Sequence, residues 1–185
     1  MIKTTFKSAI RTDNTVSPVE IIVMKSDIAG IRCAALDDRK TELIREKLAE
    51  HAHIGKEAGF DVEVHPTPAA GADIRPVELA VAIAVMLTEQ VRDDTGEFNT
   101  EVCVAAVGAL DEGGNAVPVD MDLKDACRAT QADLLYAAKG QKGLEGKDDE
   151  YDRIGEVTVP IFENMSTMRC IPDDVDEVVE QKLAV

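Results

Sequence analysis

The segment from Val77 to Leu87 constrains the fold of this chain more than any other. Ten of its eleven residues are apolar, and Glu78 is the only charged one. A helix that is apolar on every side must be buried on every side. Crossing a bilayer takes about 20 apolar residues, and this segment is shorter. The sequence therefore predicts a helix at the centre of a soluble domain that also contains strands.

Charge and aromatic content exclude several classes of partner. The chain has 185 residues, which suits one domain, and a net charge of −16. Residues 1–60 hold ten Lys and Arg against nine Asp and Glu, whereas residues 61–185 hold ten against 27. Such a surface repels phosphate, and four Phe, two Tyr and no Trp offer little for stacking bases. We expect no nucleic-acid partner; the charge suits solubility, a crowded assembly or a basic partner.

Cysteine usage and the N-terminus bear on the compartment. The four cysteines, at positions 33, 103, 127 and 170, show no close pairing, which is typical of buried thiols in a reducing compartment. The chain begins Met-Ile-Lys with no apolar run behind it, so no signal peptide is expected. We therefore expect a protein of the cytoplasm, or of a virion if a phage encodes it, with no membrane contact.

The first part of the chain is rich in β-prone residues. Residues 1–17 are expected to form an N-terminal strand or a loose arm, with Asp13-Asn14-Thr15 as a turn, and residues 18–185 the main domain. The runs from Val19 to Met24 and from Ile28 to Leu36 predict two strands. Ser26-Asp27 between them favours an antiparallel hairpin, and Gly30 is alternatively a bulge in its second strand.

Periodicity and turn residues predict the rest of the chain. We expect helices at 39–54, 77–87, 122–131 and 173–183. We expect strands at 60–64, 102–107, 117–119, 134–138 and 157–162. Loops are expected at 65–76, 92–99, 108–116 and 139–153. This order predicts a single layered α+β domain with a mixed sheet and a buried central helix.

The order and four of its motifs resemble the ribosomal-protein-S5 domain-2-like fold over about Val19 to Val179. The most similar members are the proteolytic domain of Lon proteases and the N-terminal domain of the ComM and magnesium-chelatase group. The motifs are a strand, Pro-Gly loop and buried helix (DVEVHPTPAAGADIRPVELAVAIAVML), a strand, Gly-acid turn and return strand (VCVAAVGALDEGGNAVPV), the helix that begins DLKDA, and an Asn followed by an "IP-x-x-V" ending. Glu78-Leu79 is similar to the acidic-Leu pair of ComM-like chains.

The resemblance to Lon implies a Ser-Lys dyad, which this chain does not complete. In Lon-like enzymes a Ser at the start of the buried helix attacks, and a Lys on the next helix is the base. Lys124 lies where that Lys falls, but the family's Pro-Ser corresponds to Pro76-Val77 or, shifted by one residue, to Arg75-Pro76. Thr67 is the only nearby hydroxyl and comes too early in the loop. Lys124 is thus the one candidate catalytic residue, and the alternative is a first-turn surface lysine.

Other groupings of chemically active residues are weaker. His51 and His53 are two apart on a predicted helix and point to different faces, so a metal site would need His65 with Glu63 or Asp61. Four carboxylates, at 111, 112, 120 and 122, lie near the predicted hairpin. Gly140, Gly143 and Gly146 alternate with Lys139, Lys142 and Lys147, but no phosphate-binding loop motif is present. We expect no metal and no cofactor.

Three functions fit these observations. The first is a non-catalytic structural or assembly module that forms homo-oligomers or joins a larger complex through sheet edges and the C-terminal helix. The second is a divergent peptidase or hydrolase that uses Lys124 with a partner other than serine. The third is a regulatory subunit of a separate AAA+ ATPase. The missing nucleophile and nucleotide motif favour the first.

Overall fold

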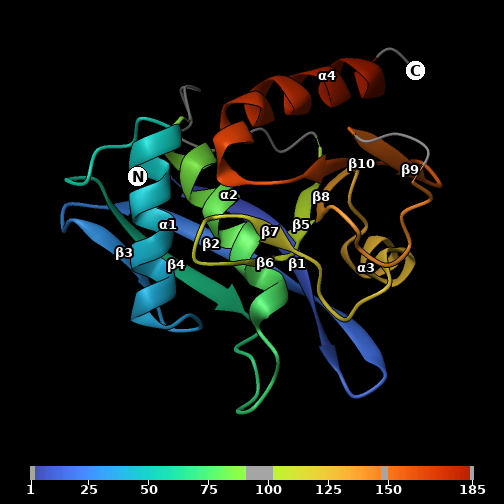
Figure 1. Cartoon of the computed structure of the whole chain (residues 1–185), viewed down its shortest axis with the longest axis horizontal. Helices are drawn as coiled ribbons and strands as arrows, with labels where there is room; N and C mark the ends of the chain where they lie inside the picture. The colour runs from blue at the N-terminus through green and yellow to red at the C-terminus, as the bar shows by residue number, and fades with distance from the viewer. Residues whose placement is uncertain (1–2, 91–101, 147–149, 184–185) are drawn as a thin grey trace.

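An eight-stranded mixed sheet forms the body of the molecule (Figure 1). The computed structural model describes residues 3–90, 102–146 and 150–183. The strand order is β3-β4-β2-β1-β5-β8-β10-β9, and a separate two-stranded hairpin joins β6 to β7. Within these residues four α-helices accompany the sheet, so the fold is the single α+β domain that the sequence predicts. The expected polar connection at 92–99 lies outside the described residues.

The elements have the following bounds. The strands are β1 (Lys3–Thr12), β2 (Thr15–Ser26), β3 (Gly30–Cys33), β4 (Gly59–His65), β5 (Val104–Val107), β6 (Ala109–Leu110), β7 (Ala116–Val117), β8 (Leu134–Ala138), β9 (Tyr151–Ile154) and β10 (Val157–Phe162). The α-helices are α1 (Asp38–His51), α2 (Glu78–Glu89), α3 (Leu123–Thr130) and α4 (Ile171–Leu183). Short 3-10 turns, η1 (Arg75–Val77) and η2 (Met165–Cys170), lead into α2 and α4.

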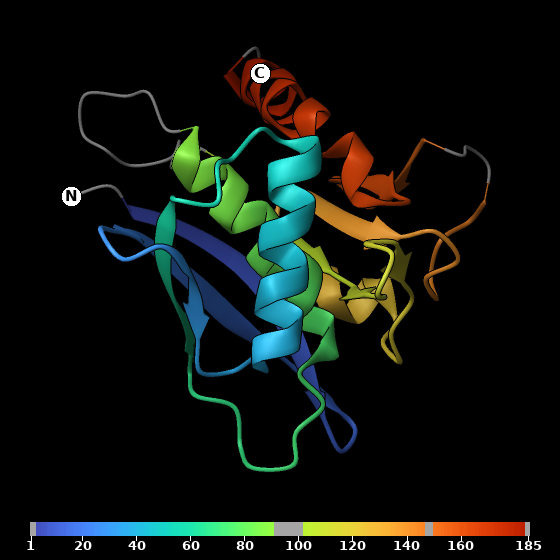
Figure 2. The same ribbon diagram turned by 60° about the vertical axis from the view of Figure 1, so that its left-hand side comes forward.

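Helices cover both faces of the sheet, and the strand side chains divide between them. Successive residues of a strand point to opposite faces. In β5, Val104 and Ala106 join the apolar cluster that contains α1, α2 and α4, whereas Ala105 and Val107 join the cluster that contains α3. Figure 2 shows α1 and α2 side by side on one face. The molecule is thus built in three layers, with α2 and α3 on opposite faces of the sheet.

Helix α2 is the buried central helix that the sequence predicts. Every residue from Glu78 to Thr88 is buried. It contacts β1, β2 and β5 on one side and α1 on the other. Burial from all directions explains why this helix needs no polar face.

The predicted hairpin between residues 19–24 and 28–36 is wrong. The hairpin is formed instead by β1 and β2, whose tight turn at Asp13-Asn14 pairs Thr12 with Thr15. β4 lies between β2 and β3, and β3 pairs with it in parallel. The segment β3-α1-β4 is a crossover unit, which sets its two strands side by side in parallel. β-propensity located these strands but carries no information on their partners.

The N-terminal segment takes the strand form rather than that of a loose arm. β1 pairs with β2 on one side and with β5 on the other. Phe6 and Ile10 lie in the same apolar cluster as α2. β1 is therefore an internal strand of the sheet.

The C-terminal helix docks on its own domain. Val175 is 1% exposed, and Val178 and Val179 pack against the main core. The buried Tyr136 hydroxyl donates to the Asp174 carboxylate at 2.9 Å. Burial raises the pKa of Asp174 above its usual value. In the part of the chain that the structure describes, no helix is long and apolar enough to cross a membrane.

Candidate functional site

The start of α2 is closed by backbone rather than opened toward solvent. η1 brings Pro76 and Val77 to the helix, and both are buried. The N–H of Gly108 donates to the Pro76 carbonyl, and the N–H of Leu79 donates to the Gly108 carbonyl, both at 3.0 Å. A Cβ on Gly108 would lie 3.2 Å from the Leu79 side chain, so glycine permits this close approach. Pro76 and Val77, which the resemblance to Lon predicts to stand at the family's serine position, are apolar and buried here.

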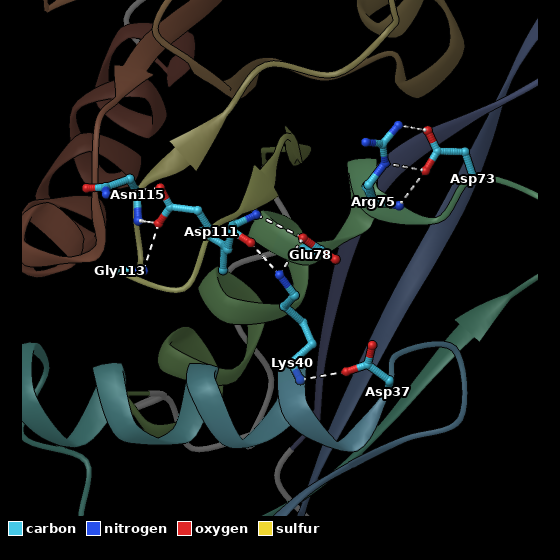
Figure 3. A network of polar contacts seen from close by, with 9 residues as sticks. Asp37, Lys40, Asp73, Arg75, Glu78, Asp111, Gly113 and Asn115 are labelled. Carbon is cyan, nitrogen blue, oxygen red and sulfur yellow. Dashed lines mark hydrogen bonds and ion pairs between the residues drawn. The ribbon is translucent and has the colours of Figure 1, made fainter.

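An ion pair between buried Glu78 and partly buried Lys40 joins three elements at this point (Figure 3). Glu78, in the first turn of α2, lies 3.3 Å from the Lys40 ammonium of α1, and the two side chains are 9% and 21% exposed. Glu78 Oε1 also accepts from the N–H of Leu110 at 2.9 Å, and Lys40 Nζ donates to the Leu110 carbonyl. A buried carboxylate is tolerated when it is paired and hydrogen-bonded. The pair therefore ties α1, α2 and β6 together.

The neighbouring turns are fixed by carboxylates of their own. Asp37 caps α1, where its side chain accepts from the Lys40 N–H at 2.8 Å. Asp111 accepts from the N–H groups of Asn115 and Gly113, both at 2.9 Å, and these bonds, led by that from Asn115, hold its pKa below the usual value. We call Asp37, Lys40, Glu78 and Asp111 the α2 junction.

A second carboxylate pair lies just before α2. Arg75 donates from Nε and Nη2 to the two oxygens of Asp73, each at 2.9 Å. The Arg75 hydrogen bonds lower the pKa of Asp73. Both side chains are substantially exposed, so this pair fixes the loop that enters η1 rather than lining an interior site.

Ser8 is a buried hydroxyl close to the start of α2, and its hydrogen-bond partners are carbonyl groups rather than a base. Ser8 Oγ is completely buried in β1 and lies 2.7 Å from the Ala106 carbonyl and 3.3 Å from the Pro76 carbonyl. A serine nucleophile needs a neighbouring group that accepts its proton, and an amide carbonyl is no such base at neutral pH. Thr67, the hydroxyl that the sequence offered, is exposed in the loop before α2.

Lys124 stands apart from the α2 junction. It lies in the first turn of α3 and is exposed. Its backbone N–H receives a cap from Asp122 at 2.9 Å, but its ammonium forms no hydrogen bond or ion pair with any described residue. Because α3 lies on the opposite face of the sheet from α2, Lys124 occupies the position of a surface lysine.

The histidine and carboxylate groupings are dispersed. His65 contacts Glu63 at 2.8 Å on an exposed stretch of β4. Asp120 pairs with Arg11 at 2.6 Å. Across the described residues, no group of three or more His, Cys, Asp or Glu side chains is placed to hold a metal ion.

The glycine- and lysine-containing segment after β8 is a set of turns. Lys139 lies 3.3 Å from Glu163, and the N–H of Leu123 donates to the Lys142 carbonyl at 2.9 Å. Gly143 packs against Asp122 and Leu123. Lys147 lies outside the described residues.

The cysteines have no disulfide partner. Cys33 and Cys127 are buried, Cys103 is half-buried and Cys170 is exposed. Burial raises the pKa of Cys127 to about 11, and burial also raises the pKa values of Cys33 and Cys103. A thiol with a raised pKa is a poor nucleophile at neutral pH, so these three residues behave as apolar packing groups.

The sequence interpretation missed the Lys40–Glu78 pair. Its signal was Glu78, the one charge in the apolar segment 77–87, because a buried carboxylate requires a cation or several hydrogen-bond donors. Comparison with known proteins does not assign the chain to a family. No protein-family model matches the chain, and no curated protein matches it.

Proposed function

We propose that this protein is a non-catalytic structural or assembly module built on a Lon-like scaffold, working in the cytoplasm or in a virion. The four motifs that resemble Lon and ComM fall in chain order on β4 to α2, on β5 to β7, on α3, and on β10 to α4, with β8 and β9 between the last two. The proposed relationship to Lon and ComM rests on this order. The residues of the four motifs form strands, turns and the buried helix of the domain.

The closed start of α2 is the observation that carries the proposal. Pro76 and Val77 are buried, and Glu78 is held by Lys40 and by the Leu110 N–H. Acyl transfer by a dyad requires a nucleophile within hydrogen-bond reach of its base, and the Lys124 ammonium has no described partner. A scaffold without a nucleophile can still act through contacts that its surfaces make with other chains.

Assembly is the use that those surfaces favour. The sheet ends in two edge strands, β3 and β9, and an unpaired strand edge is a template for pairing with another chain. The C-terminal helix is already engaged by its own domain through Tyr136 and Val175. The sheet edges are therefore the stronger candidates for contact with other chains.

Two measurements on the whole protein test this function. Light scattering after size exclusion should give a mass above that of one chain, and a strict monomer at high concentration would contradict self-association. Casein and peptide turnover should be absent in the wild type and in Lys124→Ala alike. Turnover that disappears in Lys124→Ala would instead establish the hydrolase alternative.

A further inference from the structure

The C-terminal helix α4 lies at the rim of the molecule and docks through one face. Figures 1 and 2 both show it outside the sheet, with the C-terminus at its far end. Ile171 and Val175 are each 1% exposed, and Val178 and Val179 pack against the main core. Most of its other described side chains are exposed. α4 is therefore attached to the domain along a narrow apolar stripe.

Polar contacts tie α4 to the domain at both of its ends. The hydroxyl of Tyr136, which is 2% exposed, donates to the Asp174 carboxylate at 2.9 Å. Lys182 Nζ lies 3.1 Å from Asp133 Oδ2, and these side chains are 51% and 34% exposed. An exposed ion pair contributes little to stability and is screened by salt. The interior contact with Tyr136 is therefore the stronger of the two ties.

The charges on α4 repel one another and the rest of the chain. Four exposed carboxylates share one face of the helix, at positions 173, 176, 177 and 180, and like charges at these spacings are unfavourable. The helix dipole favours a negative charge in the first turn alone, so it does not offset the repulsion among the last three. Residues 165–183 hold five carboxylates against two cations, Arg169 and Lys182, in a chain of net charge −16. Self-repulsion of this kind opposes the compact state, so it weakens the docking of α4, and added salt reduces it.

The surroundings of Asp174 oppose its ionisation. It faces the Tyr136 hydroxyl of β8, Asp173 and Glu177 flank it on α4, and the thiol of Cys170 lies near Tyr136 at the end of η2. Burial is the main cause that raises the pKa of Asp174; the Tyr136 hydrogen bond opposes this shift, and the charges of Glu177 and Asp173 add to it. The docked helix therefore favours the protonated carboxyl. This stabilisation is full below the usual pKa of 3.8 and is lost as the pH rises through the raised value.

We propose that α4 is a charge-sensitive strap, which closes on the domain through Tyr136 and Asp174 and opens as a unit when its carboxylates are ionised and unscreened. A protonated Asp174 keeps a carbonyl oxygen that accepts from Tyr136, so acid removes the charge and leaves the hydrogen bond. Opening uncovers the apolar stripe around Val175 while the sheet and α2 stay folded, as in local unfolding of a peripheral element. Low pH and added salt close the strap. It operates whether or not the protein assembles.

Hydrogen exchange of the whole protein measures the opening of α4 against that of α2. Protection factors, corrected for the intrinsic exchange rate at each pH, are compared at about pH 7 and about pH 4.5 in low and high salt. In the wild type, α4 should be less protected than α2. Relative to α2, its protection should increase several-fold at the lower pH, since a pKa shift of about one unit corresponds to about tenfold. Added salt should also increase it at neutral pH.

Three substitutions assign the effect to Asp174. Asp174→Asn removes the charge and keeps an oxygen that accepts from Tyr136, so α4 should be several-fold better protected than in the wild type at neutral pH. Glu180→Gln is the matched control, because it removes one charge from the exposed face; its effect should be smaller and should leave the pH dependence in place. Tyr136→Phe deprives the ionised carboxylate of its donor and should lower the protection of α4 more at neutral than at acid pH. Circular dichroism verifies that each variant folds.

The proposal is overturned if α4 exchanges together with α2 in the wild type, because the helix then does not open as a unit. Protection of α4 that responds neither to pH nor to salt would show that charge does not control the opening. A folded Asp174→Asn protein with no gain at neutral pH, or with a gain no larger than that of Glu180→Gln, would remove Asp174 from this role. If Asp174→Asn does not fold, Tyr136→Phe and the wild-type series in pH and salt decide the question.

Discussion

One lysine, Lys40 of α1, lies beside the start of α2, and another, Lys124, lies at the start of α3, yet their environments are opposite. At α2, Lys40 is mostly buried and contacts both Glu78 and the Leu110 carbonyl, so one side chain links three elements. At α3, Lys124 is exposed, and only its backbone N–H is engaged, by Asp122. The lysine that resembles a family base has the surroundings of a surface residue. Lys40, which no motif marked, is partly buried and paired, so burial and partners decide a side chain's role more than its place in a motif does.

The largest expected effect comes from breaking the α2 junction. Glu78→Ala leaves the Lys40 ammonium and the Leu110 N–H without their carboxylate, and removal of one member of a buried pair is costly. We expect the free energy of unfolding in urea to fall by about 3 kcal/mol.

The control is the same substitution at the other end of the same helix. Glu89 pairs with Lys25 at 2.8 Å, but these side chains are 32% and 36% exposed. Glu89→Ala should therefore cost less than about 1 kcal/mol. Equal losses in the two variants would show that the buried pair adds nothing to the stability of the fold.

A smaller effect is expected at the start of α3. Asp122→Ala removes the cap on the Lys124 N–H and should lower the free energy of unfolding by about 1 kcal/mol. Lys124→Ala keeps the cap and removes an exposed ammonium, so it should change stability by less than about 0.5 kcal/mol. A loss in Lys124→Ala as large as that in Glu78→Ala would erase the contrast between the two helix starts.

The smallest effect is a pH dependence at the α2 junction. Hydrogen bonds, first from the Asn115 N–H, lower the pKa of Asp111 below its usual 3.8. A carboxyl with a lowered folded-state pKa stabilises the fold above the unfolded pKa, and this stabilisation disappears as the pH falls through the folded value. The stability advantage of the wild type over Asp111→Asn should therefore be full at neutral pH and shrink below about pH 4.

Two measurements check this prediction. Unfolding curves of both proteins at several pH values give the stability difference, and the NMR titration of the Asp111 carboxyl gives its midpoint. An advantage that grows on acidification, or a midpoint above 3.8, would contradict the assigned direction.

Much of the local structure could be predicted from residue patterns. The apolar run around Leu79 to Leu87 predicted burial because no face of that helix could tolerate water. Asp37 and Asp122 each precede an amphipathic segment, and each caps the helix that follows. Strand partners could not be predicted in this way. The residues of β2 and β3 show β-propensity, yet the insertion of β4 between them depends on a crossover through α1.

The candidate site was less predictable than the fold. Lys40 and Glu78 are 38 positions apart in the sequence, and nothing in the predicted α1 distinguished Lys40 from the other charged residues of its helix. The resemblance directed attention to Lys124, because a motif locates a residue along the chain and carries no measure of its burial. The ion pair became visible only when α1, α2 and β6 were packed together.

The sequence by itself determined where the helices begin, which segment must be buried, and that the apolar residues Pro76 and Val77 precede that segment's one charge, Glu78. These are local properties, set by side-chain chemistry and periodicity. The tertiary structure alone decided which strands pair, which lysine reaches Glu78, and which strands lie at the edges of the sheet. Those outcomes depend on contacts between residues far apart in the chain. Such contacts form, and contribute to stability, only when the helices pack against the sheet.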